Sequence, residues 1–386
     1  MLVFGAQILI LYVVHFLYAR GTSVFREFCA GYDFAYFHSA AVAWRSGHNP
    51  YQVTGFVTPP PSLIIPSLLA GLSAARATFL FLCLNMALVP LSLWWYGSVL
   101  GLRVRERVLL LVSASLFISA HECIRGGNMD GLMFALLVSA FSVRRRLTGS
   151  LPLAASIVIK LYSIIFLPVA LRRRQWAFAA LTMAAVLLLL LPFHQLWPSA
   201  VHALVSRNTR YLFASIAPAT IVFSLSGGAS RAGNVIFLTF WASTFLVALC
   251  RDEEKSLSPQ TLARYVPWML ALPSLVFSYV GVLALAVLAS LLAAASQRPL
   301  RKAEYCCFTG FLLLGIHTAH VTNLLPLPYD TYHLAGLVQS SGVILMIVGT
   351  CLSPSERELD REEPSGLRIT APVHPVSVDV RPVLNR

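Results

Sequence analysis

One carboxylate, Asp33, stands among aromatic residues in the stretch GYDFAYFHSAAVAWRSGHNPY, close behind an apolar N-terminal segment. A carboxylate in a water-poor setting can serve as a general base. The pattern over 33–46 predicts a helix that ends at Gly47. Asp33, Phe37 and Trp44 would share one face of that helix, given 3.6 residues per turn. Two other interpretations stay open: Asp33 caps the helix, and the rings form an interfacial belt.

A second group of residues could bind an anion, in the stretch HECIRGGNMDGLMFALLV. We predict that Gly126, Gly127 and Asn128 open a helix, whose free N–H groups and dipole would attract a phosphate. Arg125 would lie beside it. The alternative is that Asn128 only caps the helix and Asp130 complements its dipole, which leaves Arg125 to lipid headgroups.

A third candidate is Lys160, which is embedded in apolar sequence where an ionisable group is costly and marks a functional site by default. Snorkelling of its long side chain toward water is the open alternative. The 147–171 segment is flanked by Arg triplets at 144–146 and 172–174. We expect two short half-helices that enter and return, with Lys160 near the tip, because this keeps both triplets on one side.

Composition indicates the elements that must position these side chains. Of 386 residues, 57% are hydrophobic and 12% charged, and the mean hydropathy is +0.73. These values are typical of a polytopic membrane protein. The net charge of +13 comes from short Lys/Arg clusters between apolar runs, which report topology rather than nucleic-acid binding. The seven cysteines show no zinc or redox spacing, so we expect no metal.

The apolar runs predict an all-α polytopic bundle of about 10–12 transmembrane or half-membrane helices. The integral membrane domain would cover 1–352, with a helical first extracytoplasmic loop at 19–61 and a disordered cytoplasmic tail at 353–386. The proline-rich 59–72 stretch is expected to dip in from the outer face. Spans are expected near 1–18, 76–100, 108–120, 129–143, 176–193, 235–250, 265–279, 281–295, 303–319 and 334–351.

Several segments in order resemble glycosyltransferase family 87, once filed as a domain of unknown function (DUF2029). They are GYDFAYFHSAAVAWRSGHNPY, TPPPSLIIPSLL, RGGNMDGLMFALLV and KLYSIIFLPVALRRRQW, from Gly31 to Trp176. Two positions depart from the family pattern: Thr58 stands where Tyr is usual, and Ser163 replaces the Pro of a K-L-Y-P element.

The resemblance implies a GT-C type enzyme, similar to hexosyltransferases such as mannosyltransferases. Such an enzyme moves a hexose or pentose, mannose most of all, from a polyprenyl-phosphate carrier to a hydroxyl of an envelope glycolipid or glycan. It would act as a multi-pass protein on the extracytoplasmic side of the cell membrane by a single inverting displacement. The family's catalytic Asp carries over to Asp33, its lysine to Lys160 and its helix-start Asn to Asn128.

The residue types suit this chemistry, because a lipid-phosphate leaving group needs cations or N–H donors. The expected donor-phosphate residues are Arg125, Gly126, Gly127, Asn128 and Lys160, and the expected sugar and lipid contacts are Tyr32, Phe37, Trp44 and Tyr51. Partners would be the bilayer, the lipid-linked donor and the acceptor, with no cofactor, metal or nucleic acid. Two rivals stay open: a transporter or flippase of lipid-linked sugars, and an inactive membrane scaffold.

Overall fold

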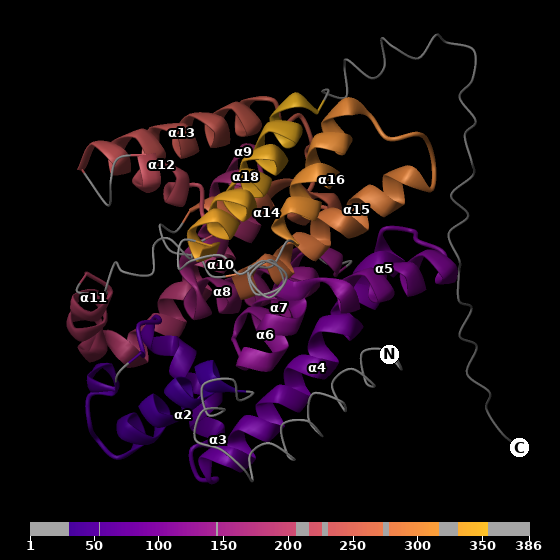
Figure 1. Cartoon of the computed structure of the whole chain (residues 1–386). Coiled ribbons are helices and arrows are strands. Elements are labelled where there is room, and N and C mark those ends of the chain that lie inside the picture. The colour runs from indigo at the N-terminus through magenta and orange to yellow at the C-terminus, as the bar shows by residue number, and fades with distance from the viewer. Residues whose placement is uncertain are drawn as a thin grey trace, which may run out of the picture. The chain divides into compact units, whose positions relative to one another are not determined.

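The computed structural model describes residues 31–53, 55–143, 146–205, 216–225, 231–272, 278–315 and 331–353. Within these ranges the chain is helical and contains no strand (Figure 1), which confirms the predicted all-α class. The chain divides into two units, 1–353 and 354–386, and every described residue belongs to the first. The predicted span at 1–18 and all but the first residue of the predicted tail at 353–386 lie outside the described residues.

The helices follow the predicted order of the spans. The α-helices are α2 (Tyr32–Arg45), α3 (Ile64–Leu69), α4 (Ala74–Val99), α5 (Val104–Leu116), α6 (Ile118–Gly126), α7 (Asp130–Ser142), α8 (Ser150–Ile159), α9 (Phe166–Arg172), α10 (Trp176–Leu190), α11 (Trp197–Val205), α12 (Ala219–Leu225), α13 (Arg231–Cys250), α14 (Pro259–Ala271), α15 (Leu285–Ala295), α16 (Lys302–Leu314) and α18 (Thr331–Leu352). Short 3₁₀ helices are η2 (Pro50–Gln52), η3 (Pro60–Leu63), η4 (Arg146–Gly149), η5 (Leu161–Ile165), η6 (Leu191–Leu196) and η8 (Ser278–Ala284).

Three helical runs are long and apolar enough to cross a membrane: Ala74–Val99, Trp176–Leu204 and Ala232–Cys250. Shorter apolar helices, among them α7 and the pieces around Lys160, accompany them. The protein is therefore a polytopic membrane protein built from full and partial spans. The prediction of one simple span at 108–120 is wrong, because α5 and α6 meet at an angle of 67°. The break falls at Phe117, whose ψ of 114° is not helical.

The chain reverses direction at Lys160. Lys160 contacts the first residue of α7, whereas the segments before and after Lys160 both contact the last turn of α7. Lys160 pairs with Asp130 at the first residue of α7. Gly149, before α8, abuts the carbonyl of Ala140 near the last turn of α7. The ring of Phe166, at the start of α9, lies 4.6 Å from that of Phe141, also in that turn. Both arms therefore return to one end of α7, which confirms the predicted hairpin with Lys160 at its tip.

No proline is needed for this reversal. Lys160 itself has an extended backbone (φ −147°, ψ 123°) that ends α8, and the 3₁₀ turn η5 starts the return arm. Ser163, which replaces the proline of the family pattern, is buried within η5. The extended residue and the tight 3₁₀ turn together provide the break that a proline would otherwise introduce.

An aromatic cluster supports α2. Phe34 is fully buried and stacks on Phe81 of α4, with ring centroids 4.3 Å apart. Phe37 meets Phe56 edge to face at 5.9 Å. The helix runs from Tyr32 to Arg45, one residue from the predicted 33–46, and Gly47 follows it in the left-handed region with φ 79°. Burial of these rings fixes the helix that carries Asp33.

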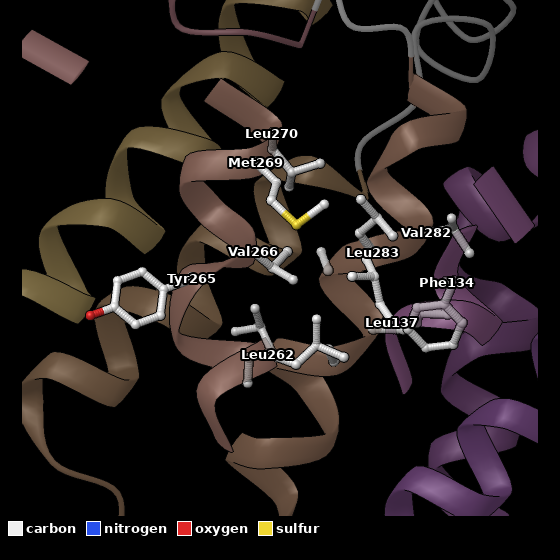
Figure 2. Close-up of a cluster of buried hydrophobic side chains, with 14 of the residues drawn as sticks. Phe134, Leu137, Leu262, Tyr265, Val266, Met269, Leu270, Val282 and Leu283 are labelled. Atoms are coloured by element: carbon white, nitrogen blue, oxygen red, sulfur yellow. The ribbon is translucent and has the colours of Figure 1, made fainter. Parts of the chain in front are cut away.

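The main core holds α7 in place. Figure 2 shows Leu262, Val266 and Met269 of α14 pointing toward Leu283 of η8, with Phe134 and Leu137 of α7 beside them. All of these side chains are buried. Because α7 is packed along its length, its first residue, Asp130, has a fixed position.

Candidate active site

Asp33 lies in the first turn of α2 but does not cap that helix. The N-cap is Gly31, with φ 85° and no side-chain cap bond. Gly31 donates its N–H to the carbonyl of Arg125 at 2.5 Å and packs directly on Thr78, where a Cβ has no room. The interpretation of Asp33 as an N-cap is therefore wrong. The start of α2 is tied to the end of α6, and this tie presents Asp33 to the residues that follow α6.

Asn128 connects Asp33 with the buried charges behind it. Its Nδ2 donates to Asp33 Oδ2 at 2.6 Å. Its Oδ1 accepts from Lys160 Nζ at 3.0 Å and from the backbone N–H of Asp130 at 3.2 Å. Its carbonyl accepts from Asn85 Nδ2 at 2.8 Å. In the described part of the chain this amide gives Asp33 its one side-chain hydrogen bond, and Asp33 itself is partly buried.

Lys160 forms a buried ion pair with Asp130, with 2.5 Å between Nζ and Oδ2. The side chain of Asp130 is fully enclosed and that of Lys160 is 7% exposed. The alternative that Lys160 snorkels to water therefore does not hold. Its ammonium is already neutralised by a carboxylate, so the geometry gives no support to direct contact between Lys160 and a donor phosphate.

The prediction that Gly126, Gly127 and Asn128 open a helix is wrong. Gly126 is the last residue of α6 and Gly127 is its C-cap, with φ 64°. The N–H groups of Gly127 and Asn128 donate to the carbonyls of Ile124 and Cys123. The physical reason is that a glycine in the left-handed region ends a helix more readily than it starts one. Helix α7 begins at Asp130, so these N–H groups are engaged in a C-cap rather than open to an anion.

Tyr32 directly precedes Asp33 in α2, and Arg125 lies near Tyr32. The Arg125 guanidinium lies close to the Tyr32 hydroxyl and interacts with it electrostatically. The Cα of Gly126 faces the same space, since a Cβ there would lie 3.3 Å from the Tyr32 hydroxyl and 3.4 Å from Asp33 Oδ2. Arg125 is half-buried. Of the two cations predicted to bind the phosphate, Arg125 is the one with no carboxylate at salt-bridge distance in the described residues. The structure thus places Arg125 near Tyr32, the residue directly before Asp33.

The electrostatic setting of Asp33 favours a proton acceptor of moderate strength. Burial raises the pKa of this carboxyl above its ordinary value, and the charges of Asp130 and Glu122 act in the same direction. The hydrogen bond from Asn128 and the charge of Lys160 oppose the rise. A carboxylate with a raised pKa is a better base than a solvated one, because it holds the accepted proton more firmly.

The other predicted aromatic ligands are placed differently. Trp44 packs on Phe193 with centroids 5.1 Å apart, and Tyr51 packs on Phe56 at 5.1 Å while its hydroxyl donates to the carbonyl of Thr58. Together with Phe37 they belong to the cluster that supports α2. Only Tyr32 of the predicted rings adjoins Asp33, and a role for the other three in contacting sugar or lipid stays a prediction.

Three polar residues of the site were missed by sequence reasoning: Asp130 as an ion-pair partner, Asn85 and Glu122. A buried lysine needs a counter-ion, and Asp130 is the one acidic residue of α7. That need is the signal that could have identified the pair. Within the described ranges, no cluster of His, Cys, Asp or Glu is arranged to hold a metal ion.

These features define a helical membrane protein with a candidate polar site, in which the partly buried carboxylate of Asp33 accepts a hydrogen bond from Asn128. The family model of glycosyltransferase family 87 matches residues 56–316, and the chain belongs to that family. The match includes the segment from Arg125 to Asn128 and Lys160, whereas Asp33 precedes it. Neither the curated proteins nor the solved structures contain a match to this chain. The protein is a membrane glycosyltransferase.

Proposed function

We propose that this glycosyltransferase moves a hexose or pentose, mannose in the first instance, from a polyprenyl-phosphate carrier to a hydroxyl group of an envelope glycolipid or glycan. The observation that carries the proposal is Asp33, a partly buried carboxylate with one side-chain hydrogen bond in the described residues, from Asn128. Family membership supports sugar transfer in general. The donor, the sugar and the acceptor are our inference.

The reaction would be a single displacement at the anomeric carbon. Asp33 accepts the proton of the acceptor hydroxyl as its oxygen forms the new glycosidic bond. The bond from the anomeric carbon to the phosphate oxygen breaks, and the lipid phosphate leaves as an anion. One carboxylate suffices, because a single inverting step needs a base but no second nucleophile, unlike the carboxylate pairs of glycoside hydrolases.

Arg125 is our candidate for the leaving phosphate. Its guanidinium lies close to the hydroxyl of Tyr32, the residue directly before Asp33, so a phosphate bound to Arg125 would place its sugar near the base. Guanidinium groups bind phosphate oxygens with two parallel hydrogen bonds, and they stabilise the charge that develops as the phosphate departs. A leaving group of this kind needs no general acid.

The positive-inside rule supports our proposal that the site lies at the outer face of the cell membrane. Arg172, Arg173 and Gln175 all contact residues of the 249–261 region, which places two of the predicted cytoplasmic clusters together. The hairpin tip with Lys160 lies at the other end of α7. If the Arg-rich end faces the cytoplasm, the end that carries Asp33 faces outward.

The test is sugar transfer by the purified full chain in liposomes, with a panel of radiolabelled polyprenyl-phosphate sugars and a glycolipid acceptor. The expected result is a labelled product whose new linkage has the anomeric configuration opposite to that of the donor. Retained configuration would contradict a single displacement. Absence of transfer from every donor would overturn the proposal, and movement of the same labelled lipids between leaflets would then identify a flippase.

A further inference from the structure

We propose that Lys160 and Asp130 form a positioning pair that orients Asp33 through the Asn128 amide, without either residue touching the substrate. This inference rests on the proposed role of Asp33 as the base. It assigns a function to an ion pair buried behind the site and reassigns Lys160 from phosphate binding to control of the base.

The geometry around Asn128 fixes which way its amide points. Two donors, Lys160 Nζ and the Asp130 N–H, converge on one side, so only the oxygen of the amide can face them. The amide nitrogen must then face Asp33 Oδ2, to which it donates at 2.6 Å. The neighbours therefore determine the orientation, and Asp33 always meets a donor.

The residue is held at its backbone as well. Asn85, fully buried in α4, donates to the carbonyl of Asn128 at 2.8 Å. Lys160 approaches from the hairpin tip and Asp130 from the start of α7. Asn128 is thus held by hydrogen bonds from three separate elements. These bonds fix the position of its side chain, which in turn orients Asp33.

The energetics point away from a purely structural pair. A buried ion pair gains little stability over apolar residues of similar size, since desolvation of both charges offsets their attraction. The cost is highest in an apolar membrane helix. The pair contacts Asn128, which among the described residues is the only side chain that hydrogen-bonds to Asp33. Its value is therefore better explained by what it does to Asn128.

The experiment compares two double variants that both remove the charges of the pair. Lys160→Met with Asp130→Asn leaves no side-chain donor from position 160 to Asn128, whereas Lys160→Gln with Asp130→Asn supplies a neutral N–H donor. Each is assayed in liposomes with a donor that the wild type uses. For the first, we expect kcat to fall about 10- to 100-fold while the KM for the donor stays within about twofold. For the second, we expect most of kcat to return.

Asn128→Ala provides an independent measurement if either double variant fails to fold, because it leaves the ion pair intact. It should lower kcat to the same extent without raising the donor KM. An unchanged kcat in Lys160→Met with Asp130→Asn, or in Asn128→Ala, would overturn the inference. So would a raised donor KM with kcat retained, which would return Lys160 to phosphate binding. Failure of the wild type to transfer any sugar would instead overturn the proposed function, and the inference with it.

Discussion

Two buried charged clusters lie at opposite ends of the hairpin around Lys160, and they are built differently. The tip cluster consists of Asp33, Asn128, Asp130 and Lys160. The base cluster consists of Arg173, Asp252, Glu254, Thr261 and Arg264. In the base cluster Arg173 donates to Asp252 at 2.8 Å, to Glu254 at 2.7 Å and to Thr261 at 2.7 Å. Asp252 also accepts from the Tyr265 hydroxyl at 2.8 Å.

The difference lies in how fully the carboxylates are bonded. Asp252 is fully buried and receives hydrogen bonds from two side chains. The guanidinium of Arg264 lies 3.7 Å from the carboxylate of Asp252. Asp33 is partly buried and receives a hydrogen bond from one side chain in the described residues. Protein donors therefore occupy the carboxylate of Asp252, whereas Asp33 receives a side-chain hydrogen bond at Oδ2 alone in the described residues. The base cluster braces the fold, and the tip cluster leaves Asp33 available for the role of base that we propose.

The largest expected effect on stability comes from the base cluster. Arg173→Met leaves the buried Asp252 and the partly buried Glu254 without the guanidinium that pairs with both of them, so the free energy of unfolding should fall by about 3–5 kcal/mol. Arg172→Met is the matched control, because Arg172 is exposed and donates only to the carbonyls of Leu249 and Cys250. It should cost about 1 kcal/mol or less.

Thermal unfolding of the detergent-solubilised variants, followed by size-exclusion chromatography, measures this contrast. Turnover per folded molecule should be unchanged in both. A selective loss of turnover in folded Arg173→Met would show that the base cluster takes part in the reaction, and the distinction between the clusters would fail.

The two adjacent glycines at the end of α6 allow effects on stability to be distinguished from effects on the candidate site. Gly127 has φ 64°, and a Cβ there would lie 2.8 Å from Cβ of Phe34. Gly127→Ala should therefore lower the free energy of unfolding by about 1–3 kcal/mol. Gly126 is helical, where alanine is favoured, but its methyl group would lie 3.3 Å from the Tyr32 hydroxyl and 3.4 Å from Asp33 Oδ2, so Gly126→Ala should change the free energy of unfolding less than Gly127→Ala does.

For Gly126→Ala we expect turnover to fall by about 10-fold, because the added methyl group would displace substrate that approaches Asp33 from the side of Gly126. Thermal unfolding and liposome transfer, measured on one preparation of each variant, give both readouts. Full turnover in Gly126→Ala would mean that substrate does not enter between Gly126 and Asp33.

The smallest expected effect is a shift in pH dependence. Burial and the charges of Asp130 and Glu122 raise the pKa of Asp33, so turnover should rise with pH through a midpoint above the value of about 4 for a solvated Asp. Glu122→Gln removes one of the charges that raise this pKa and should move the midpoint to lower pH. Transfer rates across a pH series measure it. A shift to higher pH would contradict the electrostatic assignment.

Much of this architecture follows from the sequence, because charge and apolar length constrain a membrane chain strongly. The Arg triplets around 147–171 required a return of the chain, and Lys160 lies at its tip as predicted. Helix α2 could be predicted because Gly47 ends it in a left-handed conformation. Both signals are local or topological, and a single sequence carries them.

The missed features depend on contacts between distant residues or on the direction of a helix cap. Asp130 and Lys160 are 30 positions apart, and nothing local to either pairs them. A glycine pair between two helices can belong to the end of one or the start of the next, and the prediction chose the start. The 67° break at Phe117 has no Pro or Gly to mark it.

The central claim is that Asp33 is the base, and turnover per folded molecule of Asp33→Asn tests it most directly. Asparagine keeps the shape but accepts no proton, so transfer should fall by at least about 100-fold. Because the pKa of Asp33 is raised by folding, its ionised form opposes folding at neutral pH, and the variant should unfold at a temperature no lower than the wild type. Wild-type turnover in folded Asp33→Asn would contradict the account.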